Sequence, residues 1–269
     1  MEQTVYLFRS LFYLGPLRTK TSRLYSWSGI EPDSVGYTGE NTISALLAAK
    51  TRKIGFKRQG MTKASPAKPF EVVIANSLRV MGLIESFKVN RLSEQRYEYD
   101  VKIQIKGSAS SVNLPDVGFG ISQVLPVLVE CYYAPPGSII IMEQPEIHLH
   151  PSAQSALADV LIDVIQSREN GHDRNIQLII ETHSEHFLRR LQRRIAESTI
   201  LREHVSAYFA SVTDSSSQLT PLDIDVYGNI KNWPANFFGD EMGDITGQAK
   251  AAMEKRKNER SKASGGSHE

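Results

Sequence analysis

Hydrophobic residues in the second half of the chain follow two alternating patterns. Residues 138–142 and 176–180 are nearly continuous apolar runs, which are typical of strands buried on both faces of a sheet. Residues 151–167 and 184–197, which follow them, carry apolar positions at helical spacing, and Ser184 stands where it would cap the second helix. Because this order has the length of a βαβ unit, we predict two parallel strands joined by a right-handed crossover.

The first half predicts shorter elements. Residues 5–14 are largely apolar and end at Gly15, which indicates a buried strand or a short helix. Residues 97–105 alternate apolar and polar positions, as a half-buried strand of an antiparallel pair does. The expected fold is therefore α/β, with a mainly parallel sheet, flanking helices and an antiparallel region. Helices are also expected at residues 41–50, 71–81, 122–133 and from 249, strands at 205–211 and 222–226, and loops at 19–40 and, rich in basic residues, 51–69.

The composition is that of an ordinary globular protein, since 41% of the 269 residues are hydrophobic and 23% are charged. A formal net charge of +1 argues against a protein that coats a polyanion with its whole surface. The single cysteine, Cys131, excludes internal disulfides, fits a reducing cytoplasm and is expected to be inert core. The sequence has no signal-peptide layout and no apolar run near the ~20 residues of a membrane helix, so we expect a cytoplasmic protein.

Candidate chemistry gathers at the ends of the two apolar strands. Glu143, Gln144 and Glu146 follow the first strand, and residues 181–183 (Glu-Thr-His) follow the second. Ligands of open parallel sheets bind beyond the carboxyl ends of the strands, which lie at one edge. Each of these residues alone is more simply explained as a cap or a solvated group, but two polar strand ends at one edge favour a binding site.

Three motifs in order resemble those of ABC-type P-loop ATPases, and most closely the branch of the overcoming-lysogenization-defect nucleases and the structural-maintenance-of-chromosomes (SMC) heads. IIIMEQPEIHLHP at residues 139–151 resembles the Walker B strand and the segment after it. DVGFGISQ at residues 116–123 resembles the signature loop, and IIETHS at 179–184 the switch-histidine strand. LGPLR at 14–18 and FGDEMG at 238–243 are similar to a subgroup of uncharacterised AAA-like ATPases.

The resemblance implies an ABC-like ATPase head that uses ATP and Mg²⁺. It assigns Glu143 to Mg²⁺, directly or through water, and His183 to the γ-phosphate. It assigns the signature loop to a nucleotide held by the opposite subunit of a homodimer. The loop residues concerned are Gly118, Gly120, Ser122 and Gln123. It also implies a partial lid or arm region at 1–110 and a lobe with the three motifs at 111–248. The composition of residues 249–269 predicts a basic, flexible tail.

One departure from the family pattern concerns the base. The second acidic residue after the Walker B strand is replaced by Gln144, which can orient water but cannot accept its proton. Loss of a proton-transfer group typically costs about 10²- to 10⁴-fold in rate. Glu146, two residues further on, is the alternative, and it is equally well explained as the cap of a turn.

A second departure concerns the phosphate cradle. The sequence contains no Gly-Lys dipeptide and therefore no Gly-x-x-x-x-Gly-Lys-Ser/Thr loop. We expect the chain to be the carboxyl-terminal lobe of an ATPase head, from a split gene, a truncation or an internal start, with the cradle on an amino-terminal lobe or a complementing subunit. We also expect residues 139–142 to have an unpaired edge beside them, and the chain to need a complementing fragment or self-association.

Three alternatives remain open at this point. A metal-dependent hydrolase would use His148, His150, His183 and His186 together with Glu181 and Glu185. A nucleic-acid module, with DNA as a possible partner, would use Arg189, Arg190, Arg193 and Arg194 and the basic tail, although Glu185 at i,i+4 from Arg189 also fits simple helix pairing. A catalytically inactive scaffold or nucleotide sensor would explain both Gln144 and the missing cradle.

Overall fold

The computed structural model describes residues 10–93, 96–213, 216–234, 237 and 241–264. The chain divides into two compact units, of which the larger comprises Met1–Val205 and Asp225–Asn229 and the smaller Ser206–Ile224 and Ile230–Glu269. Each unit is described by itself below. The motifs at residues 14–18, 116–123, 139–151 and 179–184 all belong to the larger unit.

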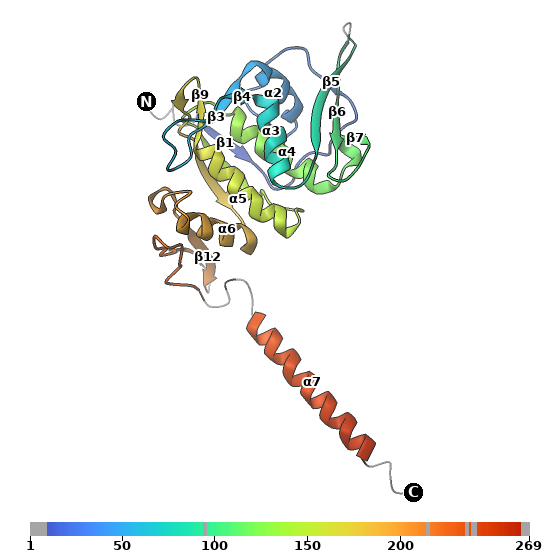
Figure 1. Cartoon of the computed structure of the whole chain (residues 1–269), viewed down its shortest axis with the longest axis vertical. Helices are drawn as coiled ribbons and strands as arrows, with labels where there is room; N and C mark the ends of the chain where they lie inside the picture. The colour runs from blue at the N-terminus through green and yellow to red at the C-terminus, as the bar shows by residue number, and fades with distance from the viewer. Residues whose placement is uncertain (1–9, 94–95, 214–215, 235–236, 238–240, 265–269) are drawn as a thin grey trace. The chain divides into compact units, whose positions relative to one another are not determined.

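The larger unit contains a three-stranded parallel sheet, of which Figure 1 labels β1. Its order is β1 (Leu11–Leu14), β8 (Ile139–Glu143) and β11 (Gln177–Glu181), with β8 in the middle. The last residues of β8 and β11, Glu143 and Glu181, are register partners. The predicted parallel pairing of the two apolar strands is thus confirmed, and their polar ends meet at one edge.

The two faces of this sheet differ in burial, because alternate residues of a strand point to opposite faces. The inner face belongs to the hydrophobic core: Phe12, Leu14, Ile140, Met142, Leu178 and Ile180. The outer face carries Leu11, Tyr13, Ile139, Ile141 and Ile179, and Leu11 and Ile179 are 40% and 54% exposed. The prediction that both apolar strands are buried on both faces is therefore wrong for the described chain.

The expected unpaired edge beside residues 139–142 is also wrong. β1 pairs in parallel with β8 along its length, from Leu11 opposite Ile139 to Leu14 opposite Met142. Within the described residues, the unpaired edges of the sheet belong to β1 and β11. Of the predicted element at residues 5–14, only the last four residues form a described strand, and residues 5–9 lie outside the described part.

Helices flank the sheet, as predicted (Figure 1). They are α2 (Thr42–Ala48), α3 (Phe70–Val80), α4 (Phe119–Tyr133), α5 (Pro151–Ile165) and α6 (Glu185–Ala196), with 3-10 turns at Ala49–Thr51, Leu114–Asp116 and Arg202–His204. α4 is buried along nearly all its length and begins three residues earlier than predicted. It contains Cys131, which is fully buried as expected, and burial raises the pKa of its thiol.

Two arginines stabilise the carboxyl end of α4. Arg52 donates to the carbonyl of Tyr133 at 2.7 Å, and the fully buried Arg174 donates to that of Tyr132 at 2.9 Å. Both guanidinium groups also lie within 4 Å of the Glu169 carboxylate. Positive charge at a helix carboxyl end is favourable, so this cluster holds in place the helix whose first turns contain residues 119–123 of the predicted signature loop.

Antiparallel strands complete the larger unit. The predicted strand at 97–105 is confirmed as β6 (Arg96–Gln104), which pairs with β5 (Ser86–Ser93), β7 (Ser111–Asn113) and β2 (Tyr25–Ser26). A second sheet has the order β10 (His172–Asp173), β9 (Ser167–Glu169), β3 (Lys53–Phe56) and β4 (Lys68–Pro69). The prediction of an unbroken loop at residues 51–69 is therefore wrong, because β3 and β4 lie within it.

The smaller unit contains a two-stranded hairpin and a long helix. β12 (Tyr208–Thr213) pairs with β13 (Ser216–Pro221), and the strand expected at 222–226 is reduced to a single bridge between Ile224 and Ile230. The predicted tail helix is present as α7 (Glu241–Ser264). Residues 238–240 of the FGDEMG motif lie outside the described part. Among the helices of the described chain, none combines the length and hydropathy that crossing a bilayer requires.

Candidate functional site

The carboxyl ends of the three parallel strands bring four side chains to the outer edge of the sheet. The Tyr13 hydroxyl of β1 donates to the Glu143 carboxylate of β8, and this hydrogen bond raises the pKa of Tyr13. His183 follows the end of β11 by two residues, and its Nε2 lies 3.0 Å from Oε1 of Glu181, the last residue of that strand. Neighbouring strands are about 4.8 Å apart, so the predicted Mg²⁺ carboxylate and the predicted switch histidine occupy adjacent strand ends.

A tight turn follows β8. Gln144 has a positive φ of 43°, which few residues other than Gly, Asn and Asp adopt. Its amide donates to the carbonyl of Glu181 at 2.9 Å, and its own carbonyl accepts from Ile147 N at 3.1 Å. The turn is thus bonded to the end of β11 and directs the chain across the strand ends.

Arg18 stabilises this turn through hydrogen bonds to its backbone. It is only 6% exposed, and it donates to the carbonyls of Glu143 at 2.9 Å and Gln144 at 3.2 Å. Burial lowers the pKa of Arg18 to about 10, against the opposing effect of the Glu146 charge. Sequence reasoning missed both Arg18 and Tyr13. The LGPLR motif at residues 14–18 contains Arg18 and is the signal that could have indicated it, and Tyr13 is the residue directly before this motif.

Glu146 ties the two strand ends together. Its Oε1 accepts from the Thr182 hydroxyl at 2.7 Å and from the His183 amide at 3.1 Å. The residue is 5% exposed, and its Oε2 is buried with no hydrogen-bond partner in the described chain. Glu146 therefore positions the turn that carries His183, and it keeps one carboxylate oxygen uncommitted.

An open pocket of about 280 Å³ lies at these strand ends. Its lining comprises Gln144, Glu146, Ile147, His148, Gln154, His183 and Ser184. The hydroxyl of Ser184 also caps α6 by accepting from Phe187 N at 3.0 Å, as the sequence predicted. The pocket brings together Gln144, Glu146 and His183. Glu143, the residue before Gln144, is not part of its lining, and its side chain lies on the outer face of the sheet with that of Tyr13.

The signature loop packs against the segment that follows β8. A Cβ at Gly120 would lie 2.9 Å from the carbonyl of His148, so the close approach requires glycine. The ring of Phe119, which is 53% exposed, meets the His148 ring edge-on at 4.7 Å. Gly118 faces open space. The exposed residues of the motif are therefore Asp116, Gly118 and Phe119, of which Phe119 contacts the pocket-lining His148.

Two predicted residues of this loop lie below the surface. Ser122 is 7% exposed, and its hydroxyl donates to the carbonyl of Phe119 at 2.7 Å. Gln123 is 2% exposed, and its side-chain nitrogen has no hydrogen-bond partner in the described part of the chain. The structure does not bring either side chain to the pocket, and their role toward a second subunit stays a prediction.

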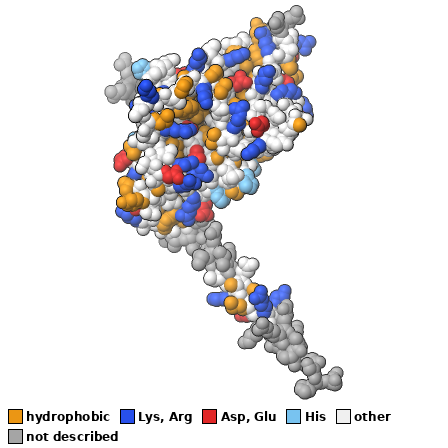
Figure 2. Space-filling model, viewed as in Figure 1, with side chains coloured by type: hydrophobic (Ala, Val, Ile, Leu, Met, Phe, Trp, Pro, Cys, Tyr) orange, Lys and Arg blue, Asp and Glu red, His pale blue; other side chains and the backbone are white. Residues whose placement is uncertain are grey.

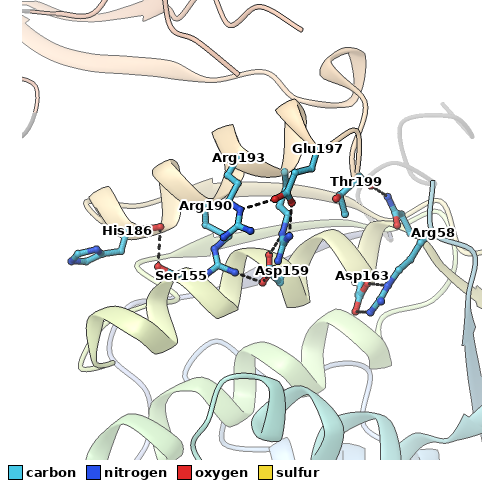
Figure 3. Close-up of polar contacts among 11 residues, drawn as sticks. Arg58, Ser155, Asp159, Asp163, His186, Arg190, Arg193, Glu197 and Thr199 are labelled. Carbon is cyan, nitrogen blue, oxygen red and sulfur yellow. Dashed lines mark hydrogen bonds and ion pairs between the residues drawn. The ribbon is translucent and has the colours of Figure 1, made fainter. Parts of the chain in front are cut away.

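The arginines of α6 are engaged in ion pairs. Figure 3 shows Asp159 of α5 facing the arginines of α6. Its carboxylate lies 2.7 Å from Arg190 and 2.6 Å from Arg194. Three further pairs involve α6 and the residue that caps it: Arg189 with Glu185 at 3.1 Å, Arg193 with Glu197 at 2.7 Å and Arg194 with Glu197 at 2.5 Å. These contacts favour a structural role for this arginine row.

The metal-hydrolase alternative has no geometric support. Among the residues that the structure describes, no three His, Cys, Asp or Glu side chains are grouped so that they could hold a metal ion. His148 and His150 are exposed on the segment after β8, where the His148 ring packs against Phe119 and the His150 ring caps α5.

The larger unit thus contains a parallel sheet with Glu143, Gln144 and His183 at or just after its adjacent strand ends. A family model described as an AAA ATPase domain matches residues 49–188, slightly more than half of the sequence. The chain belongs to this AAA ATPase domain family. A second model, described as a protein of unknown function (DUF3696), matches residues 200–248.

Solved structures of SMC proteins resemble the chain at low sequence identity. One comes from work on ATP-driven dimerization and DNA-stimulated activation of SMC ATPases (TM-score 0.43, 11% identity, 57% of this chain and 83% of that one). The others are an SMC head bound to the C-winged helix domain of ScpA (0.43, 8%, 58% and 43%) and an SMC head with an extended coiled coil bound to the carboxyl-terminal domain of ScpA derived from Pyrococcus furiosus (0.41, 11%, 57% and 34%). The chain spans less than half the length of these last two, and among curated proteins no match was found.

Proposed function

We propose that this chain supplies the Walker B and switch-histidine half of a composite site that binds and hydrolyses ATP. The observation that carries the proposal is the pocket at the strand ends of an AAA ATPase domain, where Gln144, Glu146 and His183 meet. In the reaction, water attacks the γ-phosphate, the bond to the ADP oxygen breaks, and the products are ADP and inorganic phosphate. The family and the absence of a membrane-spanning helix in the described chain fit the cytoplasmic setting that we propose.

The residues present fit a magnesium nucleotide. Glu143 offers a carboxylate at a strand end, held in place by the Tyr13 hydroxyl, and carboxylates are preferred ligands of Mg²⁺. A bound Mg²⁺ would neutralise charge on the phosphates. Nε2 of the exposed His183 imidazole lies 3.0 Å from Oε1 of Glu181, and this contact would hold the ring near a phosphate oxygen.

Two side chains of the pocket would act on the attacking water. Gln144 can hold it through its amide but cannot take its proton. Glu146 has a buried carboxylate oxygen without a partner in the described residues, whereas its other oxygen fixes the His183 turn. We therefore assign the orientation of water to Gln144 and the acceptance of its proton to Glu146.

The phosphate cradle would come from an amino-terminal lobe or a complementing subunit. We propose that its strand docks at the free edge of β11, because β11 has one neighbour in the described sheet and its Ile179 is 54% exposed on the outer face. An unpaired, apolar strand edge invites association. Without this fragment the chain should self-associate or bind a dye that recognises apolar surfaces. Monodisperse monomers that bind no such dye at micromolar concentration would contradict the proposed docking.

A second copy of the chain would contribute the signature loop. Gly118 leaves room for close approach of a phosphate, and Gly120, Ser122 and Gln123 lie in the first turns of α4, where helix amides favour anions. This part of the proposal extends to a homodimer with two nucleotides at its interface.

The test is phosphate release by the chain isolated from its own cells together with the polypeptide that completes it. Glu146→Gln should lower turnover by about 10²- to 10⁴-fold, as expected for loss of a proton acceptor. His183→Ala should also lower it, while the matched variant His186→Ala, at an exposed histidine outside the pocket lining, should not. Equal loss in both histidine variants would contradict the assigned role of His183.

A scaffold or nucleotide sensor is the second candidate, and Gln144 is the observation that favours it. It would bind ATP in the completed complex without releasing phosphate. Retained nucleotide with no turnover, unchanged by Glu146→Gln, would establish this candidate and exclude the hydrolytic one.

A further inference from the structure

A basic segment of the larger unit lies outside the nucleotide site. Between Lys50 and Pro69 the sequence has seven Lys and Arg residues and no Asp or Glu. The whole chain has a formal net charge of only +1, so this surplus is concentrated here and offset elsewhere. The segment comprises β3, β4 and the loop between them, and the face of the molecule in Figure 2 shows more Lys and Arg than Asp and Glu side chains.

The two arginines of the segment serve the fold. Arg52 binds Glu169 through two nitrogens, at 2.7 and 2.8 Å. Arg58 binds Asp163 of α5 in the same two-pronged way, at 2.7 and 2.6 Å (Figure 3). These pairs anchor both ends of β3, and the amide of Lys57 adds a hydrogen bond to the carbonyl of Gln166 at 3.0 Å. These contacts therefore anchor the loop between β3 and β4 to α5 and β9.

The lysines behave differently from the arginines. All five are exposed, and no ion pair is found for them within the described residues: Lys50, Lys53, Lys57, Lys63 and Lys68. On α6, by contrast, all four arginines are paired. Unpaired ammonium groups on an anchored loop retain their full attraction for an external anion, whereas the paired arginines have already lost most of theirs.

We infer that this lysine segment is a docking surface for the phosphate backbone of a nucleic-acid duplex. The segment exposes no aromatic ring on which unpaired bases could stack, which disfavours single strands. Met61 is its one large exposed apolar side chain, too little for the apolar core of a protein interface or for insertion into a membrane. Lysines without base-reading partners contact phosphates irrespective of sequence. The inference does not depend on the nucleotide site.

The experiment measures binding of the full chain to a fluorescent 25-base-pair duplex of DNA, and separately of RNA, by anisotropy. Five phosphate contacts predict a slope of log K against log salt of about −4.5, which is a loss of about 500-fold between 50 and 200 mM salt. Lys57→Glu/Lys63→Glu should make the slope shallower by about 2. Binding of either duplex with this slope supports the inference, and the two arms identify which duplex is bound.

Matched variants decide whether the location matters. Lys88→Glu/Lys106→Glu changes the net charge by the same amount at two exposed lysines of the β5–β6 region and should leave the slope unchanged. Lys57→Gln/Lys63→Gln, which adds no negative charge, should give the same shallower slope of log K against log salt, provided that circular dichroism shows an intact fold. Equal effects of both glutamate pairs, a larger effect of Lys255→Glu/Arg256→Glu in α7, or preference for anionic vesicles over duplex would each overturn the inference.

Discussion

The inner and outer faces of the β1–β8–β11 sheet are built from the same strands, yet only the inner face is buried. Ile140 on the inner face is fully buried, whereas Ile179 on the outer face is 54% exposed. Both lie in apolar runs of the kind that parallel strands show when helices cover both faces. The strands therefore have a sequence suited to a sheet that is covered on both faces, but the described residues of this chain cover only one face. The outer face leads directly to Glu143 and Glu181.

The largest expected effect comes from truncating one isoleucine on each face. Ile140→Ala should lower the free energy of unfolding by about 2–5 kcal/mol, because it leaves a cavity in the core. Ile179→Ala should lower it by less than about 1 kcal/mol, since half of that side chain is already in contact with solvent. Urea unfolding of both variants measures the difference. Similar losses at the two positions would show that the outer face is covered in solution, for example by a second copy.

The buried carboxyl group of Glu130 on α4 makes the free energy of unfolding depend on pH. Burial raises the pKa of Glu130 to about 7, and its Oε2 accepts from Val35 N at 2.8 Å while Oε1 is buried without a partner in the described chain. The folded state thus binds more protons than the unfolded state between about pH 4.5 and 7. The stabilisation from this group is complete below that range and is lost as the pH rises through about 7, by about 3 kcal/mol.

Glu130→Gln removes this proton linkage. Between pH 5 and pH 8 the free energy of unfolding of the variant should rise relative to the parent chain by about 3 kcal/mol. The measurement is urea unfolding at four pH values. Glu85→Gln, at an exposed glutamate, serves as the control. Parallel pH profiles for Glu130→Gln and the parent chain would contradict the raised pKa.

Local sequence patterns predicted the elements of the site better than its contacts. The apolar run before Glu143, the Ser184 cap and the βαβ order are local features, and the structure confirms them. The contact between Arg18 and Glu143 joins residues 125 positions apart, and no local pattern encodes it. The role of Glu146 was undecidable for the same reason, because its partners Thr182 and His183 follow a different strand. The burial of the strands is mispredicted because an apolar run indicates that a strand is suited to burial on both faces. It does not indicate whether the same chain provides the residues that cover both faces.

Arg18 provides an effect of intermediate size. Arg18→Met should lower the free energy of unfolding by about 1–3 kcal/mol, because the carbonyls of Glu143 and Gln144 lose a buried donor. Arg18→Lys should recover only part of this, since one ammonium group does not reproduce the fork of a guanidinium. Hydrogen exchange at the Ile147 amide, which bonds to the Gln144 carbonyl, should quicken in Arg18→Met.

The control for Arg18 is Arg23→Met, because Arg23 is 65% exposed in its pair with Asp116 and should contribute only a few tenths of a kcal/mol. If the two variants are equally stable and the Ile147 amide exchanges at the parent rate in both, Arg18 does not hold the turn after β8.

The smallest effect concerns the two sides of α6. As in the sheet, one side is partly buried and the other is exposed to solvent. Arg190 and Arg194 face Asp159 on α5 with side chains about a quarter exposed, whereas Arg189 is 55% exposed in its pair with Glu185. Asp159→Asn should therefore lower the free energy of unfolding by about 1 kcal/mol, and Glu185→Gln by about 0.3 kcal/mol. Raising the salt concentration to 1 M should shrink the second difference more than the first, because screening acts chiefly on exposed charges. Urea unfolding at both salt concentrations measures this, and equal salt sensitivity of the two variants would mean that the Asp159 pairs are as solvent-screened as those on the open side.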